Sequence, residues 1–274
     1  MQIRLFARFG LLVAATGVSV IGTWLAAQTA QLEAPPAQSN ETQSSETQSS
    51  ETLSAQPGLT AAGAQRAENL PAGINDSFLD PHMKVEDFVK RFETESREVF
   101  SSRHEILKAV QLEPGMAIAD IGSGTGLYIG AFSHAVGDTG KVFAVDIAPN
   151  FIKHLRKRVK NEGLANTKVV LCTDRDVNLR PNSIDRMFIC DVYHHFEYPE
   201  SSLASIHAAL RTGGQLILID FNNDGAGERG EWLKGHVRAP KSVFMQEIID
   251  AGFSFQEEVD IPGFHENYFL RFVK

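Results

Sequence analysis

Cysteine is scarce in this chain, which has two in 274 residues, and the chain also lacks a long basic run. Two cysteines cannot make a framework of paired disulfides. Because Cys172 and Cys190 each close an apolar run, we interpret them as buried thiols. A formal net charge of −8 without a long basic run argues against nucleic acid as a partner. The chemistry of the chain must therefore be sought in its motifs.

Residues 1–30 have the pattern of a targeting segment, with Arg4 and Arg8 ahead of the uncharged run Phe9–Ala27. The run is about long enough to span a bilayer, and no clear Ala-x-Ala cleavage site follows it. A cleaved signal peptide and an uncleaved membrane anchor, which would tether the protein through residues 9–27, both remain open. Positive charge before the run predicts a periplasmic or other extracytoplasmic domain in either case. If the segment is not a working signal, the protein is cytoplasmic.

Residues 31–82 are interpreted as a low-complexity flexible linker. The part from Glu33 to Pro57 is rich in Gln, Ser, Thr and Glu, repeats Glu-Thr-Gln-Ser-Ser, and has too few apolar side chains to bury a core. Residues 58–82 are more ambiguous, and partial order there is an alternative. The charged amphipathic segment Val85–Phe100 predicts a helix that covers a ligand site as a lid.

The most informative pattern is an apolar run, residues 116–121, that breaks into a loop containing Gly122, Gly124 and Gly126. Glycine lets the backbone approach a ligand where a Cβ would clash, and a helix that follows offers unpaired N–H groups. A second apolar run ends at the acid Asp146, whose carboxylate would accept both hydroxyls of a ribose. The order strand, glycine loop, helix, strand and acid predicts a site for an adenosine-bearing cofactor.

Strands and helices alternate along the rest of the chain, which predicts an α/β fold with a parallel sheet covered on both faces. Only a short loop, Ile261–Asn267, separates the last two strands, which predicts an antiparallel pair at one edge. The predicted strands cover about residues 116–121, 141–145, 168–171, 186–190, 215–219, 254–260 and 268–273. The predicted helices cover about residues 101–110, 127–136, 149–161, 199–210 and 242–251.

The motif Asp120-x-Gly-x-Gly-x-Gly, with Asp146, Asp174 and Asp191-Val-Tyr-His-His after the next strands, resembles the class I S-adenosylmethionine-dependent methyltransferases, in particular their small-molecule branch. The resemblance covers about residues 97–274, within a predicted domain of residues 83–274. It implies a three-layer Rossmann-like sandwich with a seven-stranded, mostly parallel sheet and an antiparallel edge strand. The dinucleotide fingerprint Gly-x-Gly-x-x-Gly has different spacing, so NAD is a minority alternative.

The resemblance also implies which residues bind S-adenosyl-L-methionine. The loop would line the methionine part, Asp146 would hold the ribose, and Ile147 would flank the adenine. Asp174 lies where the family contacts the adenine amino group, and Asp176 competes for that place. The full implied set is Asp120, Gly122, Ser123, Gly124, Gly126, Asp146, Ile147, Thr173, Asp174 and Asp191.

Methyl transfer by in-line displacement requires positioning, and requires a general base only if the acceptor cannot lose its proton unaided. His194 and His195 are the candidate bases, with Tyr193 beside them facing the methyl group. Packing against the cofactor or capping a helix is the alternative for each histidine. His236 and Arg238 are candidates for binding an anionic substrate. The alternative for His236 is an exposed loop histidine without a role in binding.

The sequence predicts no metal site. Asp191, His194, His195 and His236 could converge, but no His-x-x-x-His or Cys-x-x-Cys spacing supports a metal centre. The expected function is S-adenosylmethionine-dependent methyl transfer to a small-molecule acceptor. The alternative is an exported or membrane-tethered, non-catalytic binding protein that retains the fold. The cofactor is made inside cells, which conflicts with export of an active enzyme. The chain also lacks an acceptor motif such as Asn-Pro-Pro-Tyr, which marks amide and amine methylation of nucleic acid or protein.

Overall fold

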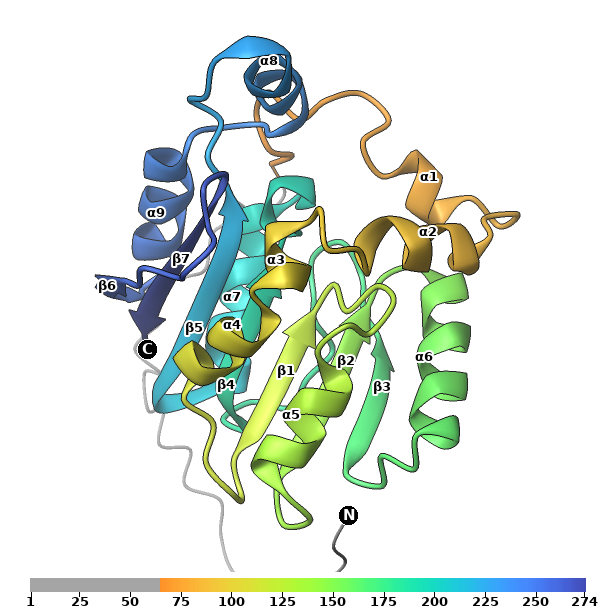
Figure 1. Cartoon of the computed structure of the whole chain (residues 1–274). Coiled ribbons are helices and arrows are strands. Elements are labelled where there is room, and N and C mark those ends of the chain that lie inside the picture. Colours follow the sequence, from red (N-terminus) through yellow and green to blue (C-terminus); the bar gives the residue numbers. More distant parts are fainter. Residues whose placement is uncertain (1–64) are drawn as a thin grey trace, which may run out of the picture. The chain divides into compact units, whose positions relative to one another are not determined.

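The computed structural model describes residues 65–274, which form a seven-stranded sheet between two layers of helices (Figure 1). Across the sheet the order is β3-β2-β1-β4-β5-β7-β6. The strands are β1 (Ala117–Ile121), β2 (Lys141–Asp146), β3 (Thr167–Leu171), β4 (Ile184–Cys190), β5 (Leu210–Phe221), β6 (Ser254–Glu258) and β7 (Asn267–Val273).

Neighbours from β3 to β5 pair in parallel, whereas β7 pairs antiparallel with both β5 and β6. The predicted fold class is therefore confirmed, with the antiparallel strand lying one position in from the edge. All five residues of β1 are buried, as expected for a central strand covered on both faces.

Alternate residues of the strands serve two cores. In one core, Ile118 packs with side chains of α4, α5 and α6; in the other, Ala119 packs with side chains of α7 and α9. The helices are α1 (Asp76–Leu79), α2 (Val85–Phe92), α3 (Glu98–Ser101), α4 (Arg103–Val110), α5 (Ile129–Val136), α6 (Pro149–Asn161), α7 (Pro199–Ala209), α8 (Gly227–His236) and α9 (Lys241–Asp250).

The register of the sheet brings the ends of its central strands together. Ile121 pairs with Val145 and Ile189, and Cys190 pairs with Ile219. The residues that come next, among them Asp146, Asp191 and Asp220, therefore lie at one edge of the sheet. The chain order also reverses between β1 and β4, the place where open α/β sheets bind ligands.

Two helical regions differ from the sequence prediction. The single helix expected over residues 85–100 is two helices, α2 and α3, separated by residues 93–97. Helix α8 was not predicted, because Gly227, Gly230 and Gly235 weaken its helix propensity and its apolar residues have no helical periodicity.

Residues 65–82, assigned to the linker from composition, contact the domain in the structure. The backbone N–H of Ala67 donates to the carbonyl of Glu197 at 2.7 Å, and Phe78 packs against Phe88. Within residues 65–274 no helix has the length and apolarity needed to cross a bilayer. The predicted targeting segment, residues 1–30, lies outside the described residues.

Candidate functional site

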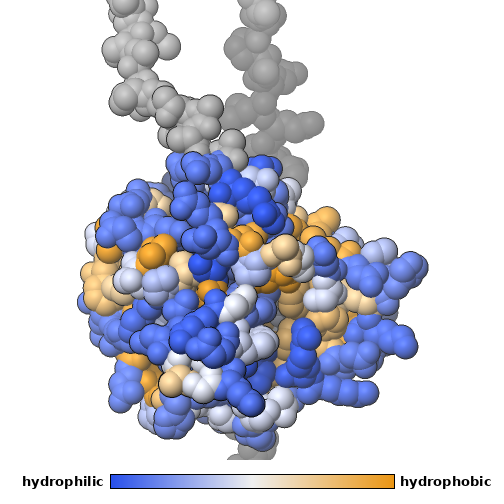
Figure 2. Space-filling view, turned by 90° about the horizontal axis from the view of Figure 1, so that it is seen from above, coloured by the Kyte–Doolittle hydropathy of each residue, from blue (hydrophilic) through white to orange (hydrophobic). Residues whose placement is uncertain are grey.

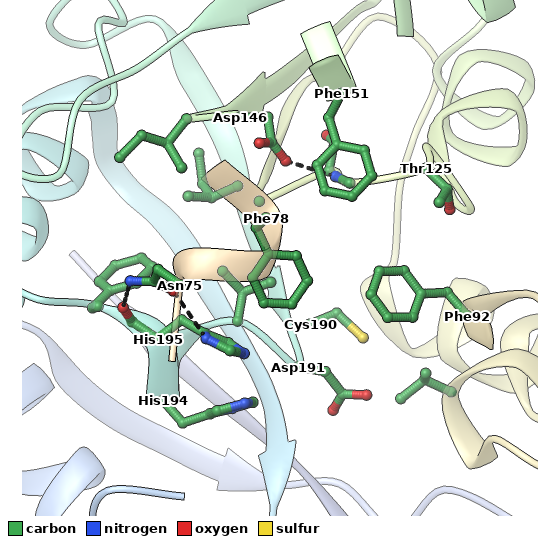
Figure 3. Close-up of a pocket in the computed structure, with 18 of the residues that line it drawn as sticks. Asn75, Phe78, Phe92, Thr125, Asp146, Phe151, Cys190, Asp191, His194 and His195 are labelled. Atoms are coloured by element: carbon green, nitrogen blue, oxygen red, sulfur yellow. Dashed lines mark hydrogen bonds between the residues drawn. The ribbon is translucent and has the colours of Figure 1, made fainter. Parts of the chain in front are cut away.

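A cavity of about 760 Å³ opens at the carboxyl ends of the central strands, within the size range of ordinary small-molecule sites. Figure 3 shows Asp146 at one end of it, His194 and His195 at the other, and the Phe78 ring between them. Residues 65–101 also contribute to the wall, so segments far apart in sequence enclose one space.

Two of the three loop glycines, Gly122 and Gly124, line the cavity, although the missing Cβ of Gly122 makes room for Val192. Gly122 has φ +72°, and a Cβ there would lie 2.5 Å from Cγ1 of Val192. Gly124 also has positive φ and donates its N–H to Asp146. Gly126 is a correction: it does not line the cavity, and its missing Cβ makes room for Leu155, so it serves loop packing.

Asp146 is buried at the end of β2. Its Oδ2 accepts the N–H of Gly124 and its Oδ1 that of Ala148, both at 2.8 Å. Burial raises the pKa of Asp146 to about 6, against the opposing effect of these backbone donors. Asp120 is buried as well, and burial raises its pKa to about 7. Two carboxyl groups with pKa values close to neutral pH thus line the cofactor end of the cavity.

The predicted adenine end is formed by Ile147, Thr173 and Asp174, all of which line the cavity. The competing candidate, Asp176, does not line it. Its Oδ1 accepts the N–H of Asn178 at 2.8 Å, so it caps a turn instead. Between the two acids, the structure favours Asp174 for a ligand contact.

Asp191 lies in the middle of the cavity wall, with the backbone in the left-handed region at φ +54°. Its carboxylate pairs with Arg97, and its Oδ1 accepts a hydrogen bond from Asn267 at 2.7 Å. Burial raises its pKa to about 6, against the opposing charge of Arg97. Asp191 therefore ties the segment before α3 to the sheet.

His194 is 1% exposed, and its ring is oriented by a residue that sequence reasoning missed, Asp220. Oδ1 of Asp220 lies 2.7 Å from Nδ1 of His194, and Oδ2 accepts the backbone N–H of His194 at 3.1 Å. Nδ1 therefore carries the proton, and Nε2 is a buried atom without a partner among the described residues. The sequence does contain a feature that could have identified Asp220: like Asp146, it is an acid that follows an apolar run.

His195 is oriented in the same manner by Asn75. The Asn75 amide nitrogen donates to the carbonyl of His195 and to Glu197, each at 3.1 Å, which leaves its oxygen facing Nδ1 of His195 at 3.1 Å. Nε2 of His195 is thus the unprotonated nitrogen. Burial, followed by the nearby imidazoles and Arg91, lowers the pKa of His195 to about 2. The residue that fixes this tautomer lies in the segment assigned to the linker.

His236 is the last residue of α8 and lines the cavity, as the sequence suggested for a substrate contact. Its ring stacks on Trp232 at 4.5 Å between centroids. Burial lowers its pKa to about 4, with the nearby His194 as the next cause. Its ring lies 5.0 Å from that of His194 and 5.5 Å from that of His195.

Two other predicted site residues, Tyr193 and Arg238, do not lie in the cavity, so the prediction is corrected for both. Tyr193 does not line the cavity: it is fully buried, and its hydroxyl donates to Glu247 at 2.7 Å. Arg238 is also outside the cavity and forms a two-pronged ion pair with Glu247, at 2.8 and 2.6 Å. The chain turns sharply after Cys190, and this turn carries the Tyr193 side chain into the core.

An aromatic cover lies over the cofactor end. It consists of Phe78, Phe88, Phe92 and Phe151, whose neighbouring centroids are 5.4–6.5 Å apart. The guanidinium of Arg91 lies over three of these rings and makes no ion pair with the described residues. Figure 2 looks onto this end of the sheet and shows hydrophobic residues exposed among hydrophilic ones. The large apolar residues at the cavity rim are Leu79, Ile147 and Trp232.

Comparison with known proteins agrees with this geometry. Residues 119–218 match the family described as "Methyltransferase domain". The ubiquinone/menaquinone biosynthesis C-methyltransferase UbiE of Shewanella frigidimarina is 29% identical over 124 residues, which cover 45% of this chain and 49% of that protein. The chain therefore spans about half the length of the curated relatives it matches.

Two solved structures share the fold. A SAM-dependent methyltransferase from Aquifex aeolicus has a TM-score of 0.59 at 22% identity and covers 69% of this chain and 98% of its own. An S-adenosylmethionine-dependent methyltransferase from Mesorhizobium loti has a TM-score of 0.53 at 13% identity, with 66% and 99% covered.

The methyltransferase domain matched over residues 119–218 and the methyltransferase relatives support the class I S-adenosylmethionine-dependent methyltransferase superfamily that the motifs predicted, and the solved structures share its fold. The cofactor of that superfamily is S-adenosylmethionine, and the residues present fit it. Gly124 lines the cavity, and a Cβ there would have no neighbouring atom nearer than 3.9 Å, so the loop backbone faces open space; Asp146 offers a buried carboxylate at the end of β2. These are the features that an adenosine-bearing cofactor with a charged amino-acid part requires.

Proposed function

We propose that the protein transfers the methyl group of S-adenosylmethionine to a small-molecule acceptor bound among the histidines of the cavity. One observation carries the proposal. The glycine loop and Asp146 share a single cavity with His194 and His195. A site for the cofactor alone would not need a second, polar end with oriented imidazoles.

The residues of the cofactor end bind and orient. When bound, S-adenosylmethionine supplies an electrophilic methyl group. Asp146 would accept the ribose hydroxyls, Asp120 would pair with the ammonium group, and Asp174 would meet the adenine. The aromatic cover excludes water, and a dry cavity strengthens each of these electrostatic contacts.

The acceptor end favours an anionic, planar molecule. Arg91 lies over the Phe78 ring, which is itself 5.2 Å from the His195 ring, and it lines the cavity without a carboxylate partner among the described residues. Asp191, Glu197 and Glu266 there are each engaged by other groups. Aromatic side chains, including Phe196 and Trp232, line the same region and suit a flat ring. We place the nucleophilic atom of the acceptor against His194, whose unpartnered Nε2 would accept its proton, while His195, with its pKa lowered to about 2, would only accept a hydrogen bond that orients the acceptor.

The relatives support the reaction type more than the acceptor. Asp220, His236 and the part of the cavity wall formed by residues 65–101 lie outside the matched residues 119–218. The acceptor of the UbiE proteins is therefore not carried to this chain, and the atom that is methylated is left to experiment.

The test uses the full-length protein. Calorimetric titration with S-adenosylmethionine and S-adenosylhomocysteine is expected to show micromolar binding of both. A screen of aromatic acceptors, in carboxylated and uncharged pairs, then measures release of S-adenosylhomocysteine and the mass of the product. Turnover of a carboxylated member supports the proposal. Binding without turnover of any acceptor favours the non-catalytic binding protein, and no binding rejects the cofactor assignment.

We also propose that residues 9–27 export or tether the protein, which puts the domain on the extracytoplasmic side. The charge pattern around Arg4 and Arg8 supports this proposal. Cell fractionation of the full-length chain tests it. Recovery in the cytoplasm would contradict the proposal and would also remove the question of cofactor supply.

A further inference from the structure

The acceptor end of the cavity contains more than a pair of candidate bases. His194 and His195 lie in the turn after β4, and His236 ends α8, so three imidazoles from two segments face one another. One ring nitrogen of each lies within 4.8 Å of the others. Figure 3 shows the His194 and His195 rings one above the other, with centroids 4.2 Å apart.

We propose that His194, His195 and His236 bind a divalent transition-metal ion, for which zinc is the best match, with a fourth position open to the cavity. Three histidines and one open position are a common arrangement for zinc in reactive sites. Nitrogens about 2.0–2.1 Å from a tetrahedral zinc lie about 3.3–3.4 Å apart, so small side-chain rotations would close the present cluster.

Two observations besides proximity indicate a metal. Histidines that bind metals usually donate their other N–H to a carboxylate or carbonyl oxygen, which fixes the ring and its tautomer. Asp220 does this for His194 and the Asn75 oxygen does it for His195. In addition, Nε2 of His194 is buried and has no hydrogen-bond partner within residues 65–274, and an unsatisfied buried polar atom costs about 1–3 kcal/mol. A metal ion would satisfy that atom.

The surrounding charges indicate what occupies the fourth position. Asp220 supplies a negative charge next to His194, whereas Arg91 adds positive charge at the cavity wall; Arg229 also lines the wall but is paired with Glu266. An oxygen of an anionic molecule would therefore complete the coordination. The ligand set contains none of the residues assigned to the cofactor, but it engages His194 and His195, against which the proposed function places the acceptor. The proposed metal site therefore rests on that acceptor site, where a bound metal ion would replace a general base by lowering the pKa of the coordinated oxygen.

The experiment uses full-length protein without a polyhistidine tag, freed of metal by a chelator. Zn²⁺ is titrated in competition with a chromophoric chelator, and Co²⁺ is added to a second sample to read its visible absorption bands. We expect one equivalent of Zn²⁺ and intense Co²⁺ bands of a four-coordinate site. His236→Gln should lower Zn²⁺ affinity by more than about 100-fold, because a ligand matters at least as much as its supporting residues. His104→Gln, an exposed histidine on α4, should not change it.

S-adenosylhomocysteine binding is measured on the same samples. Its retention in His236→Gln shows that the variant is folded and separates the two proposals. X-ray absorption of the zinc-loaded native protein gives a readout that needs no variant: three imidazole nitrogens at about 2.0–2.1 Å are expected. Zinc binding that His236→Gln leaves unchanged, or no stoichiometric binding at all, would overturn the metal site. Loss of S-adenosylhomocysteine binding with the metal retained would reject only the proposed function.

Discussion

Asp220 holds His194 from behind: its Oδ1 lies 2.7 Å from Nδ1 of that histidine, and neither side chain is exposed by more than 1%. Replacing the acid by an amide keeps the size but removes the charge that fixes the tautomer. We expect Asp220→Asn to lower zinc affinity by about 10–100-fold, as for other residues that support a ligand. The affinity for S-adenosylhomocysteine should stay the same. Chelator competition and calorimetry measure the two. An equal loss of both affinities would mean that the substitution disturbs the fold.

A substitution at Asp146 tests the cofactor end of the cavity separately from the histidines. Asp146→Ala should weaken binding of S-adenosylhomocysteine by about 1–3 kcal/mol, because charge-assisted hydrogen bonds to the ribose are lost. Titration calorimetry gives the difference. Asp138→Ala is the matched control, since that acid is exposed in the turn after α5. An affinity that Asp146→Ala leaves unchanged would refute the ribose assignment.

Cofactor binding should also depend on pH. Burial raises the pKa of Asp146 to about 6 and that of Asp120 to about 7, so both carboxyl groups gain protons as the pH falls through this range. The ribose hydroxyls and the ammonium group of the ligand bind to the charged, deprotonated carboxylates. Affinity for S-adenosylhomocysteine is therefore expected to be highest above pH 7 and to fall steadily from pH 7 to 5. Calorimetry across this range measures it, and Asp146→Asn should flatten the lower part of the profile.

The glycine loop and Asp146 were predictable because they follow one another along the chain within one strand–loop–helix–strand unit. Asp220 and His236 meet His194 only because β4 pairs with β5 and α8 follows that strand. Sheet order supplies that proximity, and no local spacing encodes it. The absence of a familiar metal spacing in the sequence was therefore a poor guide to whether three imidazoles converge.

The errors at the site have a local cause. An extended continuation of β4 would have brought Tyr193 to the cavity, but Asp191 adopts a left-handed conformation and a 3₁₀ turn follows. The turn brings both His194 and His195 to the cavity and sends Tyr193 to Glu247. Composition was also insufficient for residues 65–82, where Asn75 and Phe78 make specific contacts within a polar segment.

The proposed adenine contact distinguishes between two nearby acids, Asp174 and Asp176. Asp174 lines the cavity, whereas Asp176 caps a turn through the N–H of Asn178. We expect Asp174→Ala to weaken S-adenosylhomocysteine binding by about 0.5–1.5 kcal/mol, the usual net value of one hydrogen bond. Asp176→Ala should leave that affinity unchanged and lower only the unfolding free energy. The opposite pattern in calorimetry would move the adenine contact to Asp176.

The segment before α2 can be tested by its removal. A chain that begins at residue 83, the predicted start of the domain, lacks Asn75 and Phe78 and opens one wall of the cavity. Compared with a chain that begins at residue 65, it should lose about 1–3 kcal/mol of unfolding free energy, since Phe78 no longer covers Phe88 and Phe151. Urea unfolding measures this loss. S-adenosylhomocysteine should bind more weakly, because water then reaches the cofactor end.

The matched variant for that truncation is Phe78→Ala in the longer chain. It removes the ring that lies over the cofactor end and leaves the Asn75 contacts to His195 and Glu197 in place. If the aromatic cover excludes water, Phe78→Ala should account for most of the loss in cofactor affinity. Equal affinities of the two chains for S-adenosylhomocysteine would instead return residues 65–82 to the role of a linker, because their contacts with the domain would then contribute nothing to the site.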